Sequence, residues 1–207
     1  MHFHMWQTRQ EFTTLCDEIK QSGTLPLYLG FKDTWTCLAP WNALAVGLTD
    51  SDTCNQVNMG NTTFSDTYGP VAEKMRALLD YAEKNPYAYG YTDACTAFAR
   101  GEAAMYPIGS YAIPQIKSVN PDMNIGSFTF PANDEESDNV LNSGIDFQDH
   151  HYPSEMSVDA MVQTFLLDTS DNAQEKLLKK FDSDWKRYNR DLIRKVQDYQ
   201  KEKEEQL

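Results

Sequence analysis

The 207-residue sequence predicts an α/β fold, in which a short mixed β-sheet is flanked by helices and followed by a long C-terminal helix. Two observations support this. Several segments carry apolar residues at intervals of three or four, as amphipathic helices do. Short apolar runs lie between them and are typical of buried strands. Helices that alternate with buried strands favour an α/β domain over a helix bundle.

The first predicted element is a helix over 8–22, in which Thr8 and Glu11 have the spacing of a capping box and Gly23 can end the helix. The apolar run 25–31 then predicts a strand that is buried on both faces. A sharp turn follows this strand.

Next, residues 35–48 predict a largely buried helix with Pro40 in its first turn. The polar stretch 49–68 predicts a surface loop. A further helix should begin at Pro70, because proline is favoured at the first helical position.

The central part of the chain predicts shorter elements. They are a helix over 92–100 closed by Gly101, a strand over 103–108, a turn at Gly109-Ser110, a short helix over 111–117 and a strand over 125–131. Beyond them, a helix begins at Ser154 or Ser157, and residues 171–200 predict one long amphipathic helix with a single apolar stripe.

This order divides the chain into four parts. Residues 1–5 are a leader, 6–147 an α/β lobe, 148–153 a junction, and 154–207 helices that pack on the same lobe.

The charge distribution excludes several functions. Acidic residues outnumber basic ones by 31 to 18, and the excess lies in residues 1–170, with 22 acidic and 8 basic residues. A nucleic acid would be repelled, since phosphate binding needs a clustered basic face. The sequence also shows no membrane span and no export signal.

Neither a metal, a cofactor nor an enzymatic reaction is indicated. The four cysteines lack C-x-x-C spacing and are expected to be buried thiols. No nucleophile elbow, zinc-protease motif, phosphate-binding loop or dinucleotide-binding loop occurs. We therefore expect a protein that is not an enzyme, with no catalytic residues, no metal and no cofactor.

Two predicted strand-to-helix turns place aromatic and polar groups together, as in a ligand cleft. An aromatic face beside hydrogen-bonding groups suits a pyranose, which has apolar C–H faces and a rim of hydroxyls. The alternative is that the aromatic residues belong to the core. The candidate ligand-binding residues are Lys32, Asp33, Trp35 and Trp41 near the first turn, and Gly109, Ser110 and Tyr111 at the second.

At these residues the chain resembles the extracellular solute-binding proteins of bacterial ABC importers, in the carbohydrate-binding family that includes maltose-binding protein. The most specific match is Phe98–Met105, of the form F-x-x-G-x-A-A-M, followed by Gly109–Ala112, of the form G-S-[WY]-A. The resemblance covers 6–147 and 152–199. The other matching segments are Trp6 with Glu11-Phe12, Pro26–Ala45, Phe128–Pro131 and Asp184–Asn189.

The resemblance implies a periplasmic-binding-protein-like lobe that binds an oligosaccharide or another small solute. Tyr111 matches a sugar-stacking aromatic, and Asp33 and Trp35 match groups on the other side of the cleft. It also implies an ABC permease as partner and an extracellular or cell-surface location. Most of the first lobe of the family has no counterpart here. One lobe alone should therefore bind an oligosaccharide with a dissociation constant of about one millimolar, or not at all, and its exposed aromatic residues should favour weak self-association.

Two other classes remain open. In the first, the helix over 171–200 docks a partner helix, and the chain is an interaction or scaffold module without sugar binding. In the second, the chain is a glycoside-active enzyme, since aromatic clefts and acidic residues are common to both kinds of protein.

Overall fold

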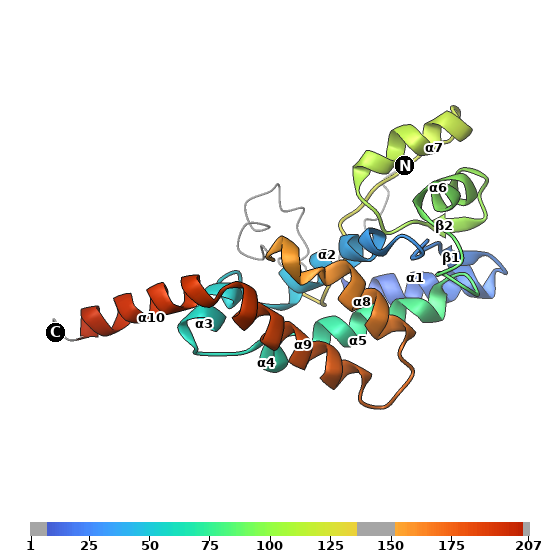
Figure 1. Ribbon diagram of the computed structural model, residues 1–207. Coiled ribbons are helices and arrows are strands. Elements are labelled where there is room, and N and C mark those ends of the chain that lie inside the picture. The colour runs from blue at the N-terminus through green and yellow to red at the C-terminus, as the bar shows by residue number, and fades with distance from the viewer. Residues whose placement is uncertain (1–7, 136–151, 205–207) are drawn as a thin grey trace.

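The computed structural model describes residues 8–135 and 152–204, and these form a largely helical molecule (Figure 1). The predicted leader 1–5, and most of the predicted junction 148–153, lie outside the described residues. The α-helices are α1 Arg9–Gln21, α2 Leu38–Leu48, α3 Thr53–Met59, α4 Phe64–Thr67, α5 Gly69–Ala77, α6 Tyr91–Ala99, α7 Ile113–Val119, α8 Val158–Leu167, α9 Ala173–Tyr188 and α10 Arg190–Glu204. Short 3-10 helices are η1 Thr34–Cys37, η2 Leu78–Tyr81, η3 Ser110–Ala112 and η6 Ser154–Met156.

The sheet is smaller than the sequence predicts. Within the described residues it has two strands, β1 Leu25–Leu27 and β2 Ala103–Met105, which pair in parallel with Leu25 opposite Ala103. The strands are parallel, so the sheet is not mixed. Because the strands are parallel, the two predicted strand-to-helix turns, which follow β1 and β2, lie at the same end of the sheet.

The predicted strand over 125–131 is wrong, because this segment has no regular secondary structure. Its aromatic residues are covered by side-chain packing instead. The rings of Phe128 and Phe130 lie 6.4 and 5.3 Å from the ring of Phe12 on α1. An apolar run can thus be buried against a helix without a partner strand, which periodicity alone does not distinguish.

The capping box of α1 is confirmed. The hydroxyl of Thr8 accepts a hydrogen bond from the backbone N–H of Glu11 at 3.2 Å, and the Glu11 carboxylate accepts one from the N–H of Thr8 at 3.3 Å. Pro40 lies in the first turn of α2, as predicted. Here the local signals in the sequence agree with the structure.

The predicted surface loop over 49–68 is also wrong, since it contains α3 and α4. Few apolar residues occur there, but Cys54, Val57 and Phe64 are all buried. The carboxylate of Asp182 on α9 accepts a hydrogen bond from the backbone N–H of Phe64 at 2.7 Å. A contact from a residue far along the chain therefore stabilises a helix of only four residues.

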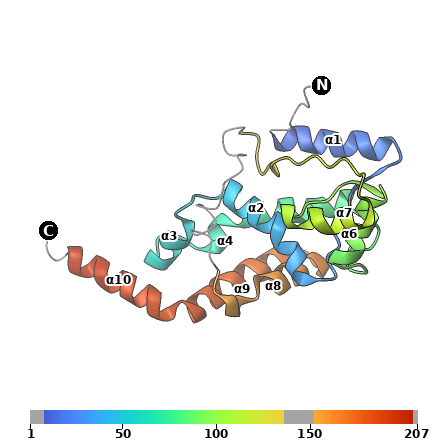
Figure 2. The ribbon, with the colours of Figure 1, turned by 90° about the horizontal axis from the view of Figure 1, so that it is seen from above.

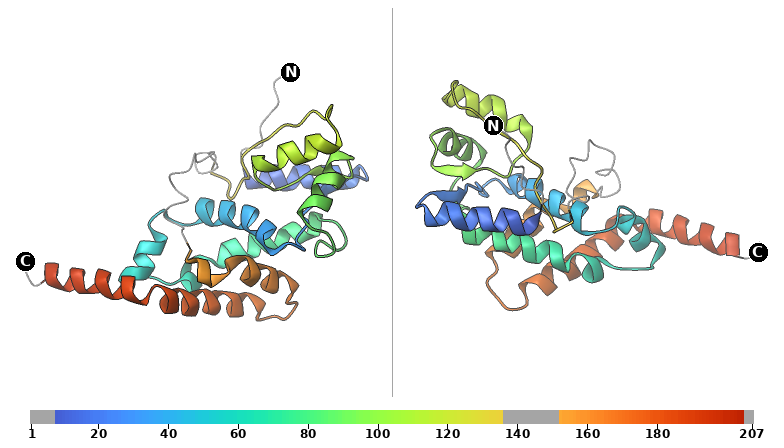
Figure 3. Two further views of the ribbon diagram at one scale, coloured as in Figure 1. Left: turned by 45° about the horizontal axis from the view of Figure 1, so that its top comes forward. Right: turned by 180° about the vertical axis from the view of Figure 1, so that it is seen from behind.

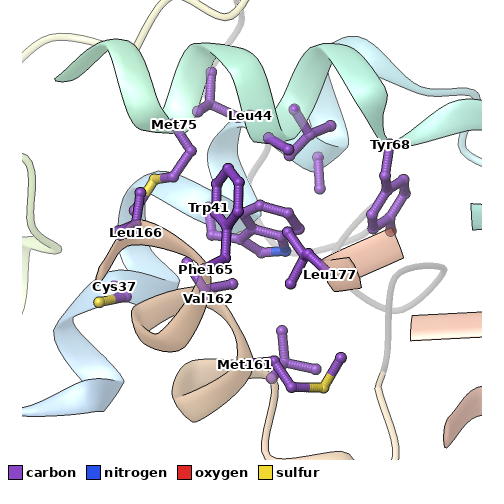
Figure 4. Packing of buried hydrophobic residues seen from close by; sticks show 14 of the residues in the cluster. Cys37, Trp41, Leu44, Tyr68, Met75, Met161, Val162, Phe165, Leu166 and Leu177 are labelled. Atoms are coloured by element: carbon purple, nitrogen blue, oxygen red, sulfur yellow. The ribbon is translucent and has the colours of Figure 1, made fainter. Parts of the chain in front are cut away.

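The main core surrounds Trp41 of α2, which has no exposed surface. Figure 4 shows this ring among side chains from α5, α8 and α9. Its ring stacks on Phe181 with centroids 5.6 Å apart, and Phe181 packs edge-on against Tyr68. The core thus joins α8 and α9 to the preceding helices.

The predicted helix over 171–200 is divided at Asn189 into α9 and α10. The apolar stripe of α9 is buried, with Leu177, Phe181 and Trp185 in the core. By contrast, α10 contains no buried residue. Its N-terminal part lies against α3, where the Gln197 amide donates a hydrogen bond to the carbonyl of Asn58 at 3.3 Å, and its C-terminal end projects away (Figure 2 and Figure 3). Of the described helices, none is both long and apolar enough to cross a lipid bilayer.

Candidate functional site

Three aromatic rings from separate elements meet at the surface beyond the sheet. They are Trp35 of η1, Tyr91 at the start of α6 and Tyr111 of η3. The Trp35 ring centroid lies 5.1 Å from that of Tyr91 and 6.2 Å from that of Tyr111, and the two tyrosine centroids are 6.4 Å apart. Trp35 is 41% exposed and Tyr111 55% exposed, while Tyr91 is half-buried. We call these three residues the aromatic platform.

The turn that carries Trp35 lies against the segment that precedes α6. The backbone N–H groups of Phe31 and Lys32 donate hydrogen bonds to the carbonyls of Pro86 and Tyr89, at 2.7 and 3.1 Å. Gly30 has φ +63°, and a β-carbon on it would lie 2.7 Å from the β-carbon of Ala94. The close approach of the turn to α6 therefore requires glycine at position 30.

The side chain of Asp33 is engaged within this framework. Its Oδ2 atom accepts a hydrogen bond from the backbone N–H of Tyr91 at 2.8 Å. Tyr91 is the first residue of α6, where unpaired N–H groups and the helix dipole favour a negative charge.

The orientation of Tyr111 depends on Gly109. A β-carbon built on Gly109 would collide with the Tyr111 ring, and even the outer ring carbon Cζ would be only 3.0 Å away. The ring therefore folds back over Gly109, while the backbone N–H of Ala112 donates a hydrogen bond to the Gly109 carbonyl at 3.0 Å. Ser110 is exposed beside it.

Burial raises the pKa of both tyrosines of the platform above the ordinary value of 10.0. Both phenols are neutral at physiological pH, and the Tyr91 hydroxyl is hydrogen-bonded to the buried thiol of Cys95. The platform combines apolar ring faces with polar hydroxyls.

The structure brings together most of the residues that the sequence singled out, with one correction. Trp41 has no exposed surface and belongs to the core, so its ring cannot stack on a solute there. Lys32 is exposed at the turn. Within the described ranges, no three His, Cys, Asp or Glu side chains gather as metal ligands do.

Sequence reasoning missed Tyr91. It lies in the alternating series Tyr87, Tyr89, Tyr91, directly after Gly90, and an aromatic residue at the first position of a helix was the available signal. Hydrogen bonds between segments far apart in the sequence, from Phe31 and Lys32 to Pro86 and Tyr89, place that helix end beside Trp35.

Comparison with solved structures defines the class of fold. The chain superimposes with a TM-score of 0.68 on the bacterial solute receptor AcbH, described as exclusively preferring β-D-galactopyranose, at 14% identity over 87% of this chain and 65% of that one. With RafE of Streptococcus pneumoniae the TM-score is 0.61, at 19% identity over 85% of this chain and 63% of that one. The fold is therefore that of a periplasmic-binding-protein-like receptor.

Sequence comparison gives the particular relationship. The chain is 31% identical over 134 residues to the multiple sugar-binding protein of Streptococcus mutans, covering 60% of this chain and 32% of the relative. It is 23% identical over 129 residues to an uncharacterised ABC-transporter extracellular-binding protein of Pyrococcus horikoshii, covering 61% and 29%. No family model matches.

The chain is thus similar to extracellular sugar-binding proteins of ABC importers over about 60% of its length, and the predicted resemblance is confirmed. The matched region spans only 32% and 29% of the length of these two relatives.

Proposed function

We propose that this chain binds a carbohydrate through the aromatic platform. The observation that carries the proposal is the meeting of three rings from separate elements, with centroids 5.1 to 6.4 Å apart, at an exposed surface. Isolated exposed aromatic residues are common on proteins, but such a cluster marks a binding surface.

A pyranose ring would stack its apolar C–H face on Trp35 and Tyr111, and the sugar hydroxyls would bond to polar groups at the edge of the platform. The phenol of the exposed Tyr111, the ammonium of Lys32 and the hydroxyl of Ser110 lie on or beside this surface. Stacking supplies affinity, and the hydroxyl contacts select among sugars.

Such a surface contacts one face of the sugar and leaves the other in water. We therefore expect a dissociation constant of about one millimolar for the described surface by itself. The proposed role is the binding of a neutral sugar without catalysis, at an extracellular location, as in the sugar-binding and ABC-transporter extracellular-binding proteins that the chain resembles. The proposed partner is an ABC permease.

Titration with a panel of neutral mono- and oligosaccharides, followed by tryptophan fluorescence, tests the proposal. A saturable change for the native chain that is lost in Tyr111→Ala is the expected result. Tyr188→Ala is the matched control, because Tyr188 is also a partly exposed tyrosine but lies at the end of α9. Binding that Tyr111→Ala leaves unchanged would place the sugar elsewhere.

The alternative function, a helix-mediated interaction, is favoured by one observation. On α10, Leu192 and Tyr199 are 48% and 67% exposed and seven residues apart, so they share a face. The other half of the predicted docking helix does not support it, because the stripe of α9 is packed inside the molecule.

A further inference from the structure

We infer that Asp33 is a positioning residue, which fixes the spacing of Trp35 and Tyr91 in the platform rather than bonding to the sugar. The inference rests on the proposed function for its ligand, whereas its geometry can be tested without any sugar.

Asp33 ties the two segments that carry these rings. Through its side chain it accepts a hydrogen bond from the N–H of Tyr91 at 2.8 Å. Through its main-chain carbonyl it accepts hydrogen bonds from the backbone N–H of Thr36 at 3.0 Å and from the Thr36 hydroxyl at 2.7 Å. A single residue therefore holds the start of α6 and the 3-10 helix that presents Trp35.

The Asp33–Tyr91 hydrogen bond lies closer to the two rings than the backbone hydrogen bonds between the same segments do. The backbone bonds of Phe31 and Lys32 join the two segments at Pro86 and Tyr89, before either ring is reached. Asp33 is one residue further on and contacts Tyr91 itself. Of the hydrogen bonds between these two segments described above, this one lies nearest to both rings, so its loss should alter the angle between the rings.

The local chemistry makes this contact strong and specific. The acceptor is a carboxylate, and the donor is a free N–H at a helix N-terminus, where the helix dipole adds to the attraction. Gly90 makes room for it, since a β-carbon on Gly90 would collide with the Asp33 carboxylate. The side chain is thus held between α6 and the turn.

Three variants separate positioning from direct sugar contact. Asp33→Ala removes the acceptor, whereas Asp33→Asn keeps a side-chain oxygen that can accept from Tyr91. Asp93→Ala is the matched control, because Asp93 bonds to the N–H of Gly90 at the same helix end, at 3.3 Å, without joining it to the turn. Each variant is first compared with the native chain by near-ultraviolet circular dichroism, which reports the mutual orientation of close aromatic rings.

We expect Asp33→Ala to change the aromatic spectrum without sugar and to weaken binding of D-galactose or maltose by about tenfold, the loss of one hydrogen bond of this kind. Asp33→Asn should restore both properties to within about threefold of the native chain. Asp93→Ala should leave the spectrum and the affinity native-like.

Two results would overturn the inference. An unaltered aromatic spectrum in Asp33→Ala would show that Asp33 does not orient the rings. A native spectrum in Asp33→Asn together with lost sugar binding would instead make the carboxylate a direct sugar ligand. If the native chain binds no sugar of the panel, the proposed function fails, and the spectra alone still decide the role of Asp33.

A variant outside Asp33 gives an independent check. Gly90→Ala pushes against the carboxylate from the other side, so it should reproduce the spectrum of Asp33→Ala. A native spectrum in Gly90→Ala would contradict the tight contact on which the inference depends.

Discussion

At the scale of single residues, Gly109 illustrates how a residue without a side chain can shape the aromatic platform. Its φ of −73° is accessible to any amino acid, so the reason for glycine lies in the adjacent ring of Tyr111. Alanine at this position should fit the backbone yet displace the ring.

Gly109→Ala is therefore expected to reduce sugar affinity by about tenfold while the free energy of unfolding changes by less than about 1 kcal/mol. Fluorescence titration and urea denaturation measure the two effects. Gly126→Ala is the control, since a β-carbon there meets no atom within 4 Å. Native affinity in Gly109→Ala would show that the ring does not need its present orientation.

Individual residues also mark the limit of sequence-based reasoning. Trp35 and Tyr111 were found because each lies in a strand-to-helix turn, which is a local feature. Trp41 stood among the candidate ligand-binding residues although its place inside a helix predicted to be largely buried favoured the core, and the stacking of its ring on Phe181 places it there. Pairings across the chain carry no signal in one sequence.

At the scale of elements, the contact between α9 and α4 shows why 49–68 escaped prediction. The four-residue helix α4 has few apolar residues, and isolated helices of this length are unstable in water. Its N-terminus is bound by Asp182 of α9, which accepts from the N–H groups of Phe64 and Ser65 at 2.7 and 3.3 Å. Thr63 and Asp66 form a capping box at the start of α4, but this local signal is followed by only one turn of helix, which depends on a distant partner.

Asp182→Ala should lower the free energy of unfolding by about 1–2 kcal/mol, because two helix N–H groups and the Ser65 hydroxyl lose their acceptor. The control is Asp184→Ala on the same helix, which breaks only an ion pair with the exposed Lys180 and should cost under about 0.5 kcal/mol. Equal losses in urea denaturation would contradict the capping role of Asp182.

The two C-terminal helices should differ sharply on truncation. Ending the chain at Asn189 removes α10, which buries no residue, so the remainder should fold and keep its affinity for sugar. Ending it at Asn172 also removes Phe181 and Trp185 from the core and should abolish cooperative unfolding. Circular dichroism during thermal unfolding separates the outcomes. If the chain that ends at Asn189 failed to fold, α10 would have a structural role.

At the scale of the whole molecule, the α/β class of the fold was predictable but the extent of the sheet was not. Alternating helices and apolar runs predicted an α/β lobe, and the solved structures on which the chain superimposes share its fold. In the segment 125–131, the rings of Phe128 and Phe130 pack against Phe12 of α1 and no strand forms. Burial therefore follows from the sequence more directly than strand pairing does.

Burial also makes the stability of the molecule depend on alkaline pH. All four cysteines are free and buried, and burial raises the pKa of the thiols of Cys16 and Cys37 from 9.0 to about 12. In the unfolded chain these thiols ionise near pH 9, whereas in the folded chain they stay protonated. The unfolded state thus binds fewer protons between about pH 9 and 12, and stability must fall as pH rises through this range.

Above pH 9, ionisation of each thiol in the unfolded chain should lower the free energy of unfolding by up to about 1.4 kcal/mol per pH unit. Urea denaturation at pH 8, 9, 10 and 11 measures this slope. Cys16→Ala should remove the contribution of one thiol from this slope. The substitution should also lower the free energy of unfolding at every pH, because it leaves a small cavity. A stability that is constant from pH 8 to 11 would mean that the thiols ionise as easily in the folded chain, and so that the core around α1 and α2 is open to water.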